Sequence, residues 1–141
     1  MSPRPAKRGE GGRRPGEGRI PYEKVRELCL SLPDVEEKLS HGAPTFFVKK
    51  RSFLMFADNH HNDGRIALWC NASEGGQEIL VGSDPDNFFI PPYVGCRGWV
   101  GVNLDKGISL AQLTGVVKDA HSTTVRAAAS RRASAKRRSR G

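Results

Sequence analysis

The sequence is poor in cysteine and has no long hydrophobic run. Its 141 residues include three widely spaced cysteines without a Cys-x-x-Cys pair, so neither a disulfide framework nor a cysteine-rich zinc site is expected. No segment approaches the roughly 20 apolar residues needed to cross a bilayer, and the first twenty residues lack the apolar core of a signal peptide. We therefore expect buried free thiols, no membrane segment, and a location in the cytoplasm that includes association with the nucleoid.

Aromatic residues are missing from both ends of the chain, and acidic residues are missing from its last part. All ten aromatic residues lie within 20–123, whereas residues 124–141 carry seven basic side chains and no acidic one. Residues 1–19 carry six basic and two acidic side chains, which leaves the middle of the chain at −3 within a total of +8. We therefore expect one folded domain at 20–123 between two disordered basic arms, with residues 127–129 able to prolong a preceding helix.

Hydrophobic periodicity within 20–123 predicts a small α+β domain. An apolar stripe at helical spacing predicts a helix over residues 22–32, and the Ser109-x-x-Gln112 capping box predicts the start of a final helix. The expected strands are residues 45–48, 52–57, 65–70 and 93–104, and a short helix is expected over 73–81. This order predicts a single two-layer domain, in which an antiparallel sheet of about five strands is flanked by N- and C-terminal helices (α-β-β-β-α-β-β-α).

Several short motifs, between about Tyr22 and about Ala120, occur in an order that resembles the MmcQ/YjbR family. The motifs are Leu32-Pro33 with Glu36-Glu37, His41-Gly42-Ala43-Pro44-Thr45-Phe46, a lysine-bearing hairpin that ends in Phe53, Asp84-Pro85 with Phe88-Phe89, Pro91-Pro92-Tyr93, and Gly98-Trp99-Val100 with Leu104. The resemblance implies a compact α+β fold, described as a double-wing arrangement, and a DNA-binding function without established catalysis. It covers neither basic arm.

Basic side chains supply the candidate nucleic-acid contacts, because Lys and Arg neutralise phosphates and release counterions. A cationic hairpin tip can follow a phosphate backbone as a wing, and a flexible basic arm can reach phosphates along a duplex. The candidates are Lys49, Lys50 and Arg51 at the hairpin tip, Arg65 and Arg97 across the sheet, and Arg131, Arg132, Lys136, Arg137, Arg138 and Arg140 in the C-terminal arm. DNA is favoured over RNA, sequence discrimination is expected to be weak because no basic recognition helix is evident, and a monomer is expected.

Aromatic side chains provide a second candidate contact. Tyr93 and Trp99 could stack on unpaired bases, whereas Trp69 is assigned to the core. The turn that contains His60 and His61 does not have the spacing of a metal loop, and no cofactor motif or catalytic constellation is present. We therefore expect no metal, no cofactor and no enzymatic activity. The alternative function is a small-molecule or protein interaction module with incidental basic arms.

Overall fold

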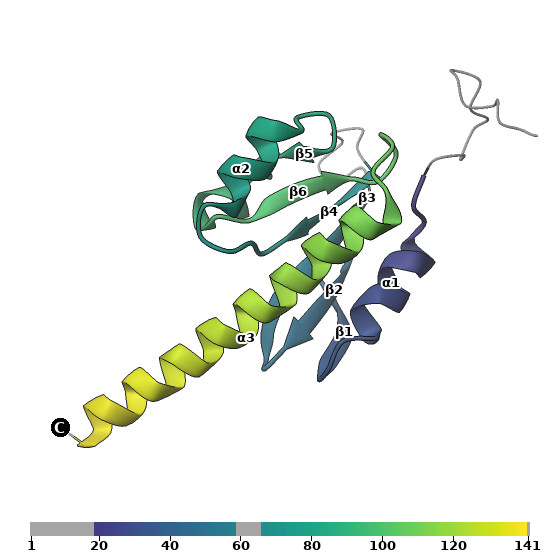
Figure 1. Cartoon of the computed structure of the whole chain (residues 1–141). Helices are drawn as coiled ribbons and strands as arrows, with labels where there is room; N and C mark the ends of the chain where they lie inside the picture. The colour runs from purple at the N-terminus through teal and green to yellow at the C-terminus, as the bar shows by residue number, and fades with distance from the viewer. Residues whose placement is uncertain (1–18, 59–65, 141) are drawn as a thin grey trace, which may run out of the picture.

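The structure is a computed structural model that describes residues 19–58 and 66–140. These residues form one antiparallel sheet and three α-helices (Figure 1). The helices are α1 (Tyr22–Leu30), α2 (Gly76–Ser83) and α3 (Leu110–Arg140), and the strands are β1 (Val35–Ser40), β2 (Ala43–Val48), β3 (Arg51–Asp58), β4 (Ile66–Cys70), β5 (Phe88–Phe89) and β6 (Val100–Asn103). A short 3₁₀ helix spans Val94–Arg97. The predicted α+β class with flanking terminal helices is confirmed. The basic N-terminal segment 1–18, Arg65 and the turn with His60 and His61 lie outside the described residues.

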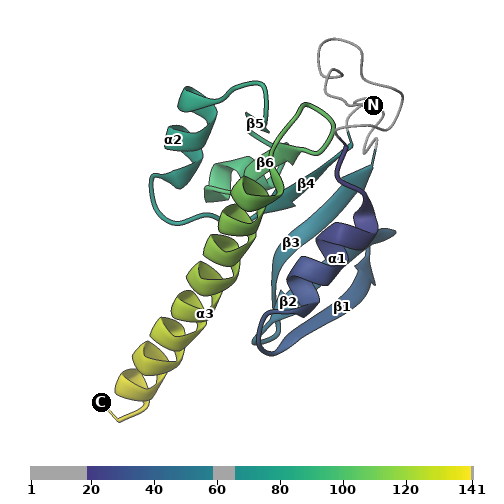
Figure 2. The ribbon, with the colours of Figure 1, turned by 45° about the vertical axis from the view of Figure 1, so that its right-hand side comes forward.

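The strands lie in the order β1-β2-β3-β4-β6-β5, and every neighbouring pair is antiparallel. Two views show α1 and α3 on the same face of this sheet, with α2 beside β5 and β6 (Figures 1 and 2). The sequence did not predict β1 or the two-residue strand β5, and the strand expected over 93–104 is wrong for its first part, since Val94–Arg97 form a 3₁₀ helix and only Val100–Asn103 form β6. The Glu and Lys residues of β1 are uncommon in strands. This strand forms at the edge of the sheet, where alternate side chains remain in solvent and charge is tolerated.

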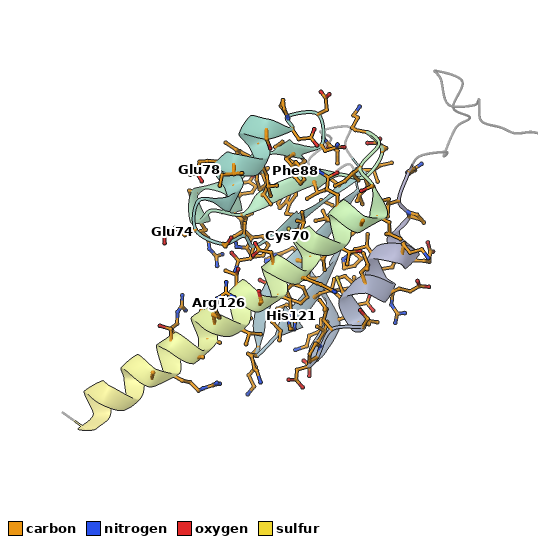
Figure 3. All side chains as sticks on the ribbon, viewed as in Figure 1. Cys70, Glu74, Glu78, Phe88, His121 and Arg126 are labelled. Atoms are coloured by element: carbon orange, nitrogen blue, oxygen red, sulfur yellow. The ribbon has the colours of Figure 1, made fainter. Side chains whose placement is uncertain are left out.

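The main hydrophobic core lies between the sheet and the two terminal helices, where side chains fill the space (Figure 3). Leu54, Leu68 and Val102 come from three neighbouring strands and have no solvent exposure. Val25 of α1 and Leu113 of α3 are equally buried against them. Packing of apolar strand residues against one stripe of each helix is the main source of stability.

A smaller apolar cluster forms on the opposite face of the sheet. Side chains alternate along a strand, so Met55 and its partner Trp69 point away from the main core. Trp69 packs there with Ala57 and Trp99. Gly101 allows this packing, since a Cβ at this position would lie within 2.6 Å of three Phe89 ring carbons.

Helix α3 begins as predicted, because Ser109 Oγ accepts the Gln112 backbone N–H at 3.0 Å. Its end differs from the prediction of a disordered segment from residue 124, because the helix continues to Arg140. Thr124 and Ala128 are buried, and Thr124 Oγ1 accepts a 2.8 Å hydrogen bond from Asn71 Nδ2. The Ala, Arg and Lys residues that follow are strong helix formers, so the packed turns can extend outward. No helix of the described residues is both long and apolar enough to span a membrane.

The three free thiols have different environments. Cys29 and Cys70 are buried in the main core, as expected. The expectation is wrong for Cys96, which lies in the short 3₁₀ helix and is exposed. Burial raises the pKa of the Cys29 thiol to about 12 and raises the pKa of Cys70 strongly as well, chiefly for the same reason.

Only the Cys96 thiol is therefore expected to react quickly with a thiol-specific aromatic disulfide at neutral pH, because the thiolate is the nucleophile and the other two thiols are buried and protonated. An absorbance assay would count one fast thiol in the folded protein and three in denaturant. Fast labelling of two or more thiols under native conditions would contradict the burial of Cys29 and Cys70.

Candidate functional site

The tip of the β2–β3 hairpin is a two-residue turn formed by Lys49 and Lys50. Both residues have positive φ, 54° and 65°. Positive φ lets a two-residue turn follow the twist of the two strands, and Asn or Gly usually occupies such positions. Two lysines therefore occupy strained positions, and such strain is common at functional sites. Arg51 follows directly as the first residue of β3 and pairs with Val48. The predicted cationic hairpin tip is present.

A cavity of about 630 Å³, here called the basic cavity, lies against this hairpin. Lys50 and Arg51 line it from the hairpin, Arg97 from the 3₁₀ helix, and Arg131 from α3. All of the charged lining residues that the structure describes are basic. The antiparallel hairpin, the segment before β6 and the far part of α3 thus bring together four cations from three separate parts of the sequence.

Among the residues that the structure describes, no carboxylate forms an ion pair with any of the four cations. Within residues 19–58 and 66–133, the side-chain ion pairs are Lys24–Glu27, Arg26–Glu37, Lys38–Glu36 and Lys49–Asp34, and none includes a cation of the basic cavity. Lys49, at the same hairpin tip, instead has its Nζ 3.6 Å from Asp34 Oδ2. Clustered positive charge without a carboxylate partner attracts anions and raises their local concentration.

Arg97 is held beside an aromatic ring at the edge of the basic cavity. Its guanidinium carbon lies 5.8 Å from the centroid of the Trp99 ring, within the range of a cation–π interaction. The buried Gln77 side chain fixes this segment, because its Nε2 donates to the carbonyls of Gly95 at 2.8 Å and Trp99 at 2.6 Å. Gln77 therefore positions Arg97 and Trp99 without lining the basic cavity itself.

A second cavity, of about 580 Å³ and here called the aromatic hollow, adjoins the basic cavity on the sheet face opposite α1 and α3. Phe47, Ser52, Arg97 and Trp99 line both cavities. Rings and a thioether supply much of the remaining surface of the aromatic hollow, from Met55, Trp69 and Tyr93. The two cavities are therefore adjacent, one basic and the other largely aromatic, and together they are called the groove.

The aromatic candidates differ in exposure. Tyr93 is 72% exposed, whereas Trp99 is 5% and Trp69 is 3% exposed. Trp69 belongs to the smaller apolar cluster, as the sequence indicated, and Trp99 belongs to the same cluster and also lines both cavities. Tyr93 is the most exposed of the three aromatic residues.

The remaining basic candidates lie elsewhere. Arg132 is exposed on α3 but does not line the basic cavity. Lys136, Arg137, Arg138 and Arg140 belong to the last turns of α3, and their side chains are not described. Arg65 lies outside the described residues.

Phe47, which lines both cavities, and Gln77, which holds Arg97 and Trp99 in place, were not predicted from the sequence. Phe47 follows Phe46 in β2, and strand alternation alone places these two rings on opposite faces. That signal was available, although it did not indicate which face carries a cavity. Gln77 lies in a short helix, and its contacts with Gly95 and Trp99 depend on tertiary packing that no local pattern encodes.

Comparison with known proteins gives a family and a related fold. A family model described as YjbR matches residues 30–123 of the chain. The fold is similar to a crystal structure of Deinococcus radiodurans protein DR2400, which carries the domain DUF419. The two share 19% sequence identity with a TM-score of 0.60, and the alignment covers 70% of this chain and 74% of that one. A search of curated proteins finds no match.

Proposed function

We propose that this protein, which belongs to the YjbR family, binds DNA through phosphate contacts in the basic cavity. The observation that supports the proposal is the convergence of Lys50, Arg51, Arg97 and Arg131 on one cavity without an ion-pair partner among the described residues. Lys and Arg are the side chains that neutralise backbone phosphates, and the guanidinium group can also donate two hydrogen bonds to one phosphate.

Helix α3 extends this basic surface away from the domain. Figure 1 shows its C-terminal part continuing beyond the sheet. Arg131 lines the cavity near the point where this extension begins, and residues 136–140 contain four further basic residues and no acidic one. In this proposal the β2–β3 hairpin acts as a wing along the DNA backbone, while the end of α3 contacts neighbouring phosphates.

The proposed contacts are to phosphate, so they carry little sequence information. We expect weak discrimination between DNA sequences, a preference for DNA over RNA, and no catalytic step. The protein would act as a cytoplasmic monomer, including on nucleoid DNA. The alternative is a small-molecule or protein interaction module. For such a module, DNA binding would not depend on the cations of the basic cavity or on the salt concentration.

The variant Arg131→Gln is expected to weaken DNA binding about tenfold, since a hydrogen bond to a charged group contributes at least about 1.5 kcal/mol. The loss should be similar for unrelated DNA sequences, and the slope of log affinity against log salt should become shallower by about 1. Fluorescence anisotropy with a labelled duplex measures both quantities.

The matched control is Arg132→Gln, which removes the same charge from the next position of α3 but outside the basic cavity. Its effect should be clearly smaller than that of Arg131→Gln. Equal losses for the two variants would contradict phosphate binding in the basic cavity, and no DNA binding by the unaltered protein at low salt would refute the proposed function.

A further inference from the structure

We propose that the aromatic hollow receives the base of an unpaired nucleotide whose phosphate lies in the basic cavity. This inference rests on the proposed function and specifies its ligand, because it predicts a preference for single-stranded over duplex DNA. It follows from the chemistry of the groove, which presents rings at one end and cations at the other.

The two cavities have the connectivity that a nucleotide requires. They share Phe47, Ser52, Arg97 and Trp99, so the two cavities lie side by side and one ligand can contact residues of both. Volumes of about 580 and 630 Å³ lie within the range of sites that hold small molecules. A nucleotide joins a flat ring to an anion through a short sugar, which matches an aromatic end and a basic end in direct contact.

The lining of the aromatic hollow favours a flat ring with polar edges. Phe47, Met55 and Tyr93 provide apolar surface for stacking, and Ser52 is a polar residue of the same lining. Arg97 stands where the two cavities meet and already lies over the Trp99 ring. Aromatic platforms of this kind bind any base, since every base has a π-face.

Backbone strain marks the exposed side of the aromatic hollow. Tyr93 has φ 65° and ψ −62°, and the Val94 N–H donates to the Pro92 carbonyl at 2.6 Å across it, which is a strained γ-turn. His41, which also lines the aromatic hollow, has φ 52° for a different reason, because it forms the two-residue turn between β1 and β2 with Gly42. Non-glycine residues retain conformations such as that of Tyr93 mainly at binding and catalytic sites.

A base inside a duplex cannot occupy the aromatic hollow, because both of its faces are stacked and its edge is paired. Entry would require the base to leave the stack, which costs free energy in a duplex and much less in a single strand. The phosphates of a duplex can still reach the cations of the basic cavity. We therefore infer that both forms of DNA bind and that the single strand binds more tightly.

The test compares a labelled single strand and a duplex of equal length by anisotropy, using the full chain. The variant Tyr93→Asn removes the exposed ring, and Asn tolerates positive φ better than most residues. It should weaken single-strand binding roughly 5- to 150-fold, the range for the loss of one stacked base, while duplex binding changes less than about twofold. The variant Tyr93→Phe retains the ring and should therefore keep the preference for the single strand.

A control variant and a fluorescence measurement test the inference without relying on Tyr93→Asn alone. Ile79→Ala shortens an exposed apolar side chain on α2, outside both cavities, and should change neither affinity. The protein has two tryptophans, and both Trp69 and Trp99 line the aromatic hollow. A single strand should therefore quench intrinsic tryptophan emission in the unaltered protein, and a duplex should not.

The outcomes separate this inference from the proposed function. Equal affinity for both forms, or an unchanged ratio in Tyr93→Asn, would overturn the base-binding inference while DNA binding remained. Failure of both forms to bind would refute the proposed function itself. Quenching by a free nucleoside monophosphate without binding of either strand would support the nucleotide site and assign it to a free nucleotide.

Discussion

Raising the salt concentration from about 50 to about 200 mM is expected to weaken DNA binding roughly 10³-fold. If about six phosphates are neutralised, log affinity should fall with log salt with a slope near −5, because each contact releases condensed counterions. Four of these contacts come from Lys50, Arg51, Arg97 and Arg131 in the basic cavity, and the others from the basic end of α3. An anisotropy titration at several salt concentrations measures the slope directly.

A truncated chain shows how much of the slope of log affinity against log salt comes from the basic cavity and how much from the end of α3. Cutting the chain after Ala133 removes Lys136, Arg137, Arg138 and Arg140 but keeps the buried residues Thr124 and Ala128, so the domain should remain folded. The slope should become shallower and should not vanish, since the cavity cations remain. A flat salt response in the full chain would be incompatible with phosphate-driven binding.

The variant Phe53→Ala is expected to lower the free energy of unfolding by about 3–5 kcal/mol, the usual cost of removing a fully buried phenylalanine ring. Phe53 has no solvent exposure. Its ring meets the His121 ring edge-on, with centroids 5.4 Å apart, and His121 lies on α3 (Figure 3). The His121 Nε2–H also donates to the Pro33 carbonyl at 2.9 Å, which ties α3 to the segment after α1.

Denaturant unfolding followed by circular dichroism would measure the effect, with the exposed Ile79→Ala as the control that should stay within about 0.5 kcal/mol. Phe53 lies in β3 at the point where the register with β2 shifts, and it packs between the hairpin and α3. The same two elements form walls of the basic cavity, so the variant should also weaken DNA binding. A loss of stability below about 1 kcal/mol would contradict the central position assigned to this ring.

Local patterns in the sequence predicted much of the architecture correctly. The helix that became α1, the hairpin with Lys49 and Lys50 at its turn, and the start of α3 at Ser109 each depend on residues close together in the chain. The strand β1 escaped prediction because its polar composition suits only an edge position, and edge positions follow from the topology of the whole sheet. The length of α3 was underestimated for a related reason, since the contacts of Thr124 with Asn71 and the burial of Ala128 come from packing.

For the candidate site, charge and residue type in the sequence were sufficient to select individual side chains. They did not show which of these side chains lie close together in space. Arg131 and Arg132 are equivalent as sequence neighbours on a basic helix, yet only Arg131 faces the basic cavity, because helical rotation turns successive residues about 100° apart.

Composition thus established a folded centre with basic ends, because burial and charge depend on residue type. Only the tertiary fold brought Arg51, Arg97 and Arg131 to one cavity and joined it to the aromatic hollow, because these residues are far apart in the chain and meet through long-range strand pairing and helix packing.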